Sequence, residues 1–415
     1  MIDVASDISK RQFPHCEPGV LYFPGHILPH GVLTSDDMDM GQKQLGLFAT
    51  FHAVQYWKFT RDLSFARERG YPLLRGIGLF WECWLTRNAT DTEIAGGAAY
   101  EFNDLNDCDN ELCAPSGKRV SGITLVLSLL PALFECIIEM SVVLDLDANR
   151  RTAWENIATH IHPYPTGVLP NSTTEIYIDY DDCDKLQGGA QACLWSVHMP
   201  VFPLGTVGLN SSAEDIKIAK ASVGAWGKYL NWRTLDSARQ FAAAARIGYN
   251  ASGTLAALES VLSPVDDGYV MYPSGYISDG DCVGLENAGF VAAVNEWCLQ
   301  SHEGALRILQ TTPPGHAIEF SQLRAEGGFL VSSGISAVGK IANFSVSLPR
   351  TAALLPERCT FFVPEQWASG AVLIHEAGSG ATVALRQERA GVMSFAVRPG
   401  VAYVARARNA NGSHS

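Results

Sequence analysis

The apolar residues of this chain change their spacing once, and this change constrains the fold more than any other feature. Up to about residue 300 they recur every three or four positions, as in amphipathic helices, whereas from about Gly328 they recur every second position, as in strands. The helical patterns cover residues 37–58, 64–84, 123–144, 148–162, 213–230, 237–247 and 254–263, and a further helix starts near residue 285. The strand patterns cover residues 329–331, 341–346, 359–363, 371–374, 382–385, 393–397 and 401–405, and an isolated one lies within 171–182. We therefore expect a helical part followed by an antiparallel β part.

The predicted helices come in pairs, such as the two that a short polar turn joins at residues 60–62. Helical hairpins separated by long loops are typical of an α/α toroid, an (α/α)6-type barrel. We count roughly eight helices where six hairpins need about twelve, so the barrel is expected to lack its first helices. The expected organisation is an irregular N-terminal segment (1–35), an α/α-barrel domain (36–322), a small antiparallel β-sandwich (323–407) and a flexible tail (408–415).

The charge balance bears on the kind of partner. The chain has 43 acidic and 30 basic residues, which argues against nucleic acid or an anionic membrane as the partner. The longest apolar run, Ile123 to Leu133, has the size of a core helix and is too short for a membrane span. A neutral ligand such as a carbohydrate fits this composition best.

Ten cysteines and six Asn-X-Ser/Thr sequences indicate passage through an oxidising, glycosylating secretory route. Cys108 and Cys113, and likewise Cys183 and Cys193, are close enough in sequence for local disulfides. Buried free thiols in a cytosolic protein are the alternative. The first residues lack the charged head and apolar run of a signal peptide, so we expect a secreted or lumenal protein whose chain here carries no signal peptide.

The segment GLENAGFVAAVNEWCLQSHEG, residues 284–304, sets Glu286 and Asn287 at the start of a predicted helix. Residues 291, 294, 297 and 298 follow at spacings of three and four, so we expect Val291, Val294, Trp297 and Cys298 to form a buried face. In one interpretation, Asn287 caps the helix and Glu286 interacts favourably with the helix dipole. A catalytic pair is the other.

The second acidic feature is the polar loop YEFNDLNDCDNELC, residues 100–113, which packs five carboxylates into eleven residues. Repulsion among clustered carboxylates raises the pKa of at least one of them toward the range of a general acid. A solvated acidic loop or a calcium site is the alternative interpretation. The five carboxylates that could supply this acid are Glu101, Asp104, Asp107, Asp109 and Glu111.

Five segments resemble the family 95 glycoside hydrolases, the α-L-fucosidase-like enzymes. They are residues 57–81, WKFTRDLSFARERGYPLLRGIGLFW; residues 121–163; residues 202–209, FPLGTVGL; residues 284–304, quoted above; and residues 323–334, LRAEGGFLVSSG. The resemblance implies a six-hairpin toroid with a C-terminal β-domain and hydrolysis of an α-linked sugar such as an α-L-fucoside. Two carboxyl groups are needed for that reaction, one as acid and one to activate water. By the resemblance, Glu111 is the proton donor and Glu286 the base, with Asn287 orienting the water in an inverting mechanism. Where the family has Asp-Gly-Asn, this chain has Leu285-Glu286-Asn287.

Four residues are candidate substrate contacts: Asp109, Trp195, His198 and His302. Filling the core, for Trp195 and His198, or capping a helix end, for His302, is the alternative. The chain shows no metal-ligand spacing, no phosphate loop and no nucleophile-base motif, so we expect neither metal nor cofactor. The alternative functions are an inactive or truncated carbohydrate-binding homologue and a polysaccharide lyase on the same toroid.

Overall fold

The computed structural model describes most of the chain. The described residues are 2–23, 44–87, 100–101, 103–104, 120–121, 123–169, 172–181, 183, 194, 196–229, 237–262, 270–271, 277–278, 285–349, 355–367 and 372–407. The chain divides into two compact units, of which unit 1 comprises Met1–Trp57 and Leu63–Pro200, and unit 2 comprises Lys58–Asp62 and Val201–Ser415. The boundaries of these units differ from those of the expected barrel and β-domain.

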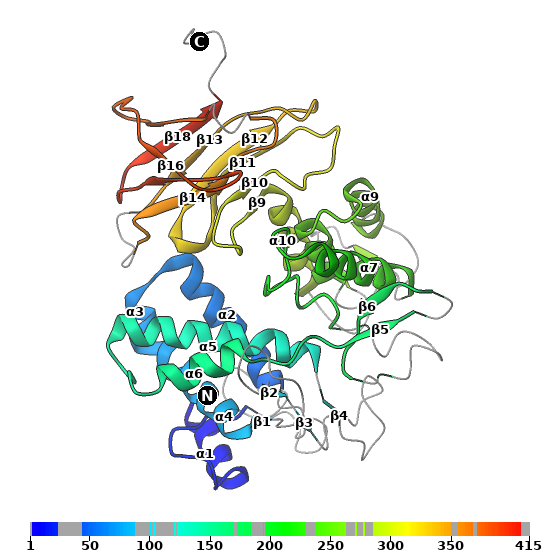
Figure 1. Cartoon of the computed structure of the whole chain (residues 1–415), viewed down its shortest axis with the longest axis vertical. Helices are drawn as coiled ribbons and strands as arrows, with labels where there is room; N and C mark the ends of the chain where they lie inside the picture. The colour runs from blue at the N-terminus through cyan, green and yellow to red at the C-terminus, as the bar shows by residue number, and fades with distance from the viewer. Residues whose placement is uncertain are drawn as a thin grey trace. The chain divides into compact units, whose positions relative to one another are not determined.

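Unit 1 is helical. Its helices are α1 (Ile2–Gln12), α2 (Gln44–Thr60, whose last turn belongs to unit 2), α3 (Leu63–Phe65), α4 (Tyr71–Trp84), α5 (Thr124–Leu144) and α6 (Arg151–Thr159), and a π-helical turn, Ala66–Gly70, links α3 to α4. Helix α5 packs against both α4 and α6, and its residues from Val126 to Ile137 are largely buried (Figure 1). The expectation of an irregular segment over residues 1–35 is wrong at its start, because α1 buries Ala5 and Ile8.

A polar cluster around Asp147 and a disulfide hold the unit 1 helices together. The Tyr71 hydroxyl and the Arg75 guanidinium both donate to Asp147, each at 2.7 Å, and they join α4 to the turn after α5. These two donors hold the pKa of Asp147 below its usual value. Cys16 and Cys83 form a disulfide that ties the segment after α1 to the end of α4. This bridge joins residues 67 apart in sequence and was not expected from the spacing of the cysteines.

Helix α5 agrees with the helix expected at residues 123–144. The expectation that no apolar segment reaches the length of a membrane span is wrong, because the apolar part of α5 extends beyond Leu133. Among the helices in the described part of the chain, α5 alone is long and apolar enough to cross a membrane, by length and composition only. In the structure 61% of its most apolar window is buried, as in the core helix of a folded unit. The fully buried Leu127, Leu130 and Phe134 are part of the unit 1 core.

Short antiparallel pairs close the long loops of unit 1. They are β1 (Thr86–Arg87) with β2 (Tyr100–Glu101), β3 (Asn103–Asp104) with β4 (Val120–Ser121), and β5 (Thr166–Val168) with β6 (Glu175–Tyr177). The strand expected within residues 171–182 corresponds to β6, and its partner β5 was not expected.

The helical part of unit 2 consists of α7 (Ala213–Tyr229), α8 (Ser237–Arg246), α9 (Ala251–Leu262) and α10 (Leu285–Cys298). Helix α8 packs against the other three, and the large buried side chains Phe241, Leu258 and Trp297 meet in one core. Asn250 caps α9 by accepting a hydrogen bond from the backbone N–H of Gly253. Helices α7 and α8 and the start of α10 agree with the expected ranges within one residue, whereas α9 begins three residues before the expected Thr254.

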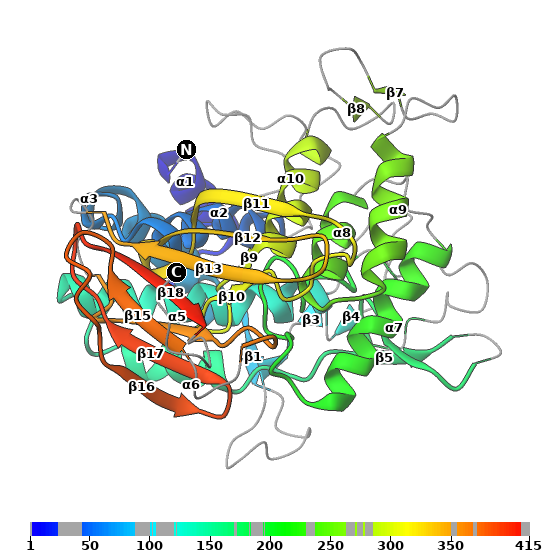
Figure 2. The same cartoon turned by 90° about the horizontal axis from the view of Figure 1, so that it is seen from above.

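The β part of unit 2 contains two antiparallel sheets (Figure 2). The larger sheet has the order β11, β12, β13, β18, β15, and the smaller has the order β14, β17, β16. Their bounds are β11 (Ile318–Arg324), β12 (Leu330–Ile335), β13 (Ile341–Ser347), β14 (Arg358–Phe362), β15 (Val372–Glu376), β16 (Leu385–Arg389), β17 (Val392–Ala396) and β18 (Ala402–Ala407). A shared core joins the sheets: the Phe344 ring of β13 lies 5.2 Å from that of Phe361 in β14.

The strands expected from the period-two pattern are present except for the one at residues 382–385, because β16 begins only at Leu385. Strand β11 precedes them all. The expected boundary at residue 323 therefore falls inside β11, which begins at Ile318. Two further pairs, β9 (Leu299–Gln300) with β10 (Arg307–Ile308) and β7 (Val270–Met271) with β8 (Ile277–Ser278), complete unit 2 as described.

Candidate functional site

Glu286 and Asn287 lie inside the first turn of α10, which begins at Leu285. The first backbone N–H groups of a helix have no partner within it and favour a negative charge nearby. Asn287 is thus within the helix rather than a cap before it.

The expected buried face of α10 is wrong in part. Val291 and Val294 are exposed, at 61% and 45%, whereas Phe290 and Ala293 are buried beside Trp297. The face that contacts α8 and α9 is therefore rotated from the expected one, and it is Phe290, Ala293 and Trp297 that anchor the helix whose first turn carries Glu286.

The acidic loop that carries Asp109 and Glu111 is closed at its base by β3 and β4. Asp104 pairs with Val120 and Asn103 with Ser121, so the loop leaves and rejoins the structure at one antiparallel pair. Asp109, Glu111 and Trp195 themselves lie outside the described residues, as do Cys108, Cys113 and Cys193. Cys183 is disulfide-bonded.

His302 lies at the opposite end of α10 from Glu286, in the turn between β9 and β10. Twelve residues separate Glu286 from Cys298, the last residue of the helix, which corresponds to about 18 Å at about 1.5 Å per residue. The structure therefore does not bring His302 to the candidate base, and one sugar ring cannot contact both. His198 is buried in a turn of unit 1, at Val197–Pro200.

The His302 ring is enclosed by the FPLGTVGL loop. A Cβ atom at Gly205 would lie 2.5 Å from His302 Cδ2, and one at Gly208 would lie 3.1 Å from its Nε2. Burial, together with the charges of Arg246, Arg307 and Lys58, holds the pKa of His302 well below its ordinary value, so the ring is neutral near pH 7. Neither ring nitrogen has a hydrogen-bond partner among the described residues.

Replacement of Gly205 by alanine is expected to destabilise the protein by about 2–5 kcal/mol in urea unfolding. The backbone φ of Gly205 is +72°, which costs other residues about 1–2 kcal/mol, and the clash with His302 adds about 1–3 kcal/mol. The matched control is Gly304→Ala, because Gly304 has the same φ of 72° but no atom within 4 Å of the added Cβ. Equal losses for both variants would show that His302 does not pack as described.

A buried ion pair fixes the same region. Arg246 at the end of α8 donates from Nε to Glu296 Oε2 of α10 at 2.8 Å, and from Nη1 to the carbonyl oxygens of Val201 and Pro203 at 2.9 and 3.2 Å. The two side chains are only 6% and 13% exposed. One guanidinium thus joins α8, α10 and the start of the FPLGTVGL loop. Its pairing with Glu296 was not anticipated, because the two charges lie 50 residues apart.

Two segments that resemble the family meet in unit 2: the turn at residues 300–302, which ends the 284–304 segment, and residues 323–328, which begin the C-terminal one. The Glu326 backbone N–H donates to Ser301 Oγ at 3.0 Å. Burial raises the pKa of Glu326 above its usual value, against the opposing charges of Lys58, Arg246 and Arg61. The C-terminal motif therefore lies at the end of α10 that is remote from Glu286.

Among the described residues, one group of potential metal ligands gathers: His15, Cys16 and Cys83, whose ligand atoms lie within 4.8 Å of one another. The two sulfurs are joined in the disulfide, so they offer no thiolate to a metal. This group gives no reason to assign a metal to the chain.

Sequence comparison decides the relationship. The family model described as the glycosyl hydrolase family 95 catalytic domain matches residues 31–187, the segment that contains Asp109 and Glu111. Over this segment the chain is similar to the family 95 glycoside hydrolases. Alpha-L-fucosidase 2 of Arabidopsis thaliana is 23% identical over 299 residues, which are 69% of this chain and 34% of that protein. These matches confirm the resemblance to the family that the sequence motifs indicated.

Two solved structures are similar to this chain. A protein described as a kojibiose phosphorylase from the human microbiome has a TM-score of 0.48 at 12% identity, over 87% of this chain and 48% of that one. An alpha-L-rhamnosidase of Streptomyces avermitilis, complexed with L-rhamnose, has a TM-score of 0.44 at 11% identity, over 90% of this chain and 34% of that one. The chain thus spans less than half of the length of each of these three proteins.

Proposed function

We propose that the chain belongs to a glycoside hydrolase that removes an α-linked L-sugar, such as an α-L-fucoside, from a glycan or polysaccharide. The observation that carries this proposal is the family 95 catalytic-domain match over residues 31–187. The similarity to alpha-L-fucosidase 2 supports the choice of sugar. The proposal includes an α/α toroid formed by the paired helices and a sandwich formed by the two C-terminal sheets.

The proposed mechanism uses two carboxyl groups and inverts the anomeric centre. Glu111, with Asp109 as its nearest rival, protonates the leaving oxygen, while Glu286 takes a proton from a water that Asn287 orients. The attacking water then bonds to the anomeric carbon as the bond to the leaving oxygen breaks. Such a reaction needs the carboxyl groups about 6.5–9.5 Å apart. Support comes from the position of Glu111 in the matched segment and of Glu286 in the first turn of α10.

The substrate is proposed to be neutral, to contact Trp195, and to be met in the secretory route or outside the cell. His198 is only 1% exposed, which favours the alternative that it fills the core of unit 1. The excess of acidic over basic residues supports a neutral substrate. The disulfide between Cys16 and Cys83 supports an oxidising compartment.

A carbohydrate-binding homologue without hydrolytic activity is the second candidate. Leu285 stands where the family sequence Asp-Gly-Asn has its aspartate, and this substitution favours the candidate directly. The two functions differ in outcome but share the ligand class.

The test is incubation of the purified protein with aryl α- and β-glycosides, including α-L-fucoside, α-L-galactoside and α-L-rhamnoside, with the released phenol followed by absorbance. Release from one α-L-glycoside, with the product of opposite anomeric configuration by NMR, is the expected result. Release of sugar with retained configuration would contradict the inverting mechanism. A folded protein that binds these sugars but releases none would establish the second candidate instead.

A further inference from the structure

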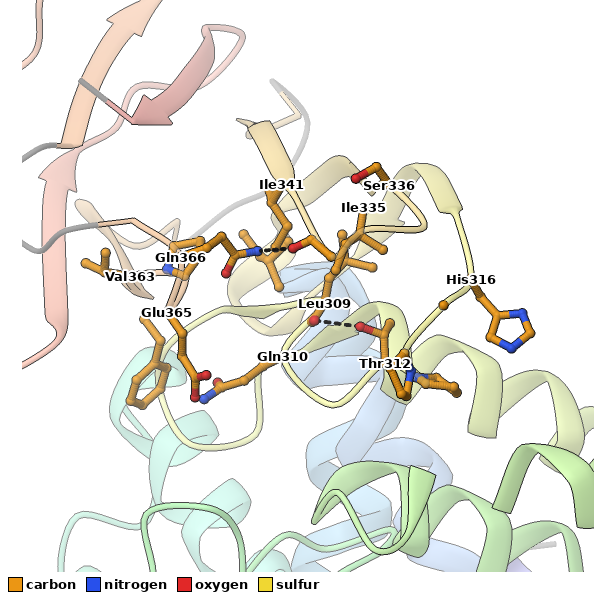
Figure 3. A pocket seen from close by; sticks show the side chains of 17 residues that line it. Leu309, Gln310, Thr312, His316, Ile335, Ser336, Ile341, Val363, Glu365 and Gln366 are labelled. Carbon is orange, nitrogen blue, oxygen red and sulfur yellow. Dashed lines mark hydrogen bonds between the residues drawn. The ribbon is translucent and has the colours of Figure 1, made fainter. Parts of the chain in front are cut away.

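A cavity of about 210 Å³ lies in unit 2, beside the β sheets (Figure 3). Three segments line it: the loop after β10, residues 308–316; the turn between β12 and β13, residues 335–341; and the end of β14 with the following loop, residues 362–366. At about 30 Å³ per water molecule, the cavity corresponds to about seven waters, which is room for one small ring.

The cavity has an apolar wall. Ile335, Ile341 and Val363 come from the β strands and their ends, and Pro313 from the loop opposite. Ile341 and Pro313 are buried, while Ile335 and Val363 are half-buried, so part of this wall faces the opening. An apolar wall of this kind suits the C–H face of a pyranose ring.

Three polar side chains at the rim keep unused hydrogen-bonding atoms. Gln310 Oε1 accepts from Arg307 Nη1 at 2.8 Å, which fixes the amide and leaves Nε2 to donate. Gln366 Nε2 donates to the Gly339 carbonyl oxygen at 3.1 Å, which leaves Oε1 to accept. The Glu365 carboxylate has no ion pair or hydrogen bond with another described residue and accepts only. The rim thus offers the Gln310 donor and the Gln366 acceptor, each fixed by a hydrogen bond of its amide, and the Glu365 carboxylate as a further acceptor.

The charges around the cavity disfavour an anion. Arg307 lies behind Gln310, but its guanidinium pairs with Glu303 at 2.6 Å and stacks over the Phe362 ring at 3.4 Å. No lysine or arginine is among the residues that line the cavity as described. His316 points away from the other labelled side chains (Figure 3). The available charge is therefore the negative charge of Glu365.

From this combination we propose that the cavity is a binding site for one ring of a neutral sugar. Neighbouring hydroxyl groups on a sugar both donate and accept, which complements the Gln310 amide on one side and the Gln366 oxygen and Glu365 carboxylate on the other. Leu309, in the lining, donates its backbone N–H to Cys298 at the end of α10, so the site lies about 18 Å along that helix from Glu286. A sugar held here is not the one positioned for the candidate base.

The experiment is saturation-transfer NMR and isothermal titration of the purified protein with L-fucose, D-galactose, D-glucose and D-xylose, and with D-glucuronate as the anionic comparison. We expect at least one neutral sugar to bind and glucuronate to bind more weakly. The variant Gln310→Ala/Gln366→Ala should weaken that binding about tenfold or more, whereas Gln387→Ala, an exposed glutamine of β16, should leave it unchanged. Glu286→Gln should also retain it, which separates this site from the proposed reaction.

Three results would overturn the proposal: no neutral sugar binds, glucuronate binds more tightly than every neutral sugar, or the double variant binds like Gln387→Ala. Gln310 and Gln366 are exposed, so the fold is expected to survive, and the melting curve checks this. The single variants Gln310→Ala and Gln366→Ala repeat the measurement if the double variant does not fold. None of these outcomes depends on hydrolysis, so the experiment tests the binding site independently of the proposed reaction.

Discussion

Replacement of Glu286 by glutamine is expected to lower kcat/KM for the preferred glycoside by about 10²–10⁴-fold while the protein remains folded. Glutamine keeps the size of the side chain and its place in the first turn of α10 but cannot accept a proton. Because no carboxylate then takes the proton from the attacking water, kcat should fall while KM stays nearly unchanged. The measurement is steady-state kinetics on the aryl glycoside that the wild-type protein cleaves.

Glu214→Gln is the matched control for this variant. Glu214 also lies in the first turn of a helix, α7, where its side chain is 60% exposed and pairs with Lys217. Its replacement removes the same favourable interaction with a helix dipole without touching the candidate site. Full activity in Glu286→Gln, or an equal loss in Glu214→Gln, would exclude Glu286 as the base.

Replacement of Arg246 by methionine is expected to lower the free energy of unfolding by about 3–5 kcal/mol. The variant leaves the Glu296 carboxylate buried without its cation and removes the donor to the Val201 and Pro203 carbonyl oxygens. Urea unfolding followed by circular dichroism measures the loss. Glu296 belongs to α10, so this is also a test of what holds that helix in place.

Two further variants make the Arg246 result specific. Arg386 is 69% exposed, so Arg386→Met should change stability by about 0.5 kcal/mol or less. Combining Arg246→Met with Glu296→Met should cost less than the sum of the two single variants, because the double variant leaves no buried charge unpaired. Additive losses would mean that the two side chains do not interact as described.

The helices and strands of the fold were predictable where one face of an element is apolar and the other polar. The expected ranges at residues 123–144, 213–230 and 341–346 agree with α5, α7 and β13 within one residue at most ends. In these segments the hydrophobic period and the buried face coincide, so local sequence is sufficient. The missed β11, with the sequence IEFSQLR, is mostly polar and exposed, and its pairing with β12 depends on the neighbouring strand rather than on its own composition.

The interactions that position the candidate site were harder to predict. Helix α10 has apolar residues on nearly all sides, so its period does not tell that Phe290 is buried and Val291 exposed. The Arg246–Glu296 pair and the Cys16–Cys83 disulfide join residues that are distant in sequence. Glu286 and Asn287 were placed correctly at the start of α10 because a helix start is a local property. The separation of His302 from Glu286 follows only when the helix is known to continue to Cys298.

The assignment of Lys58–Asp62 to unit 2 bears on how the chain folds during synthesis. These five residues emerge from the ribosome between two stretches of unit 1, and the remainder of unit 2 begins only at Val201. At translation rates of about 5–20 residues per second, the intervening segment of about 140 residues takes roughly 7–28 s to appear. The synthesis of unit 1 can thus be complete before Lys58–Asp62 meet the β strands of unit 2. One such contact is made by Arg324 of β11, whose guanidinium donates to the Phe59 carbonyl oxygen. Unit 2 closes late, around a piece of chain that was made early.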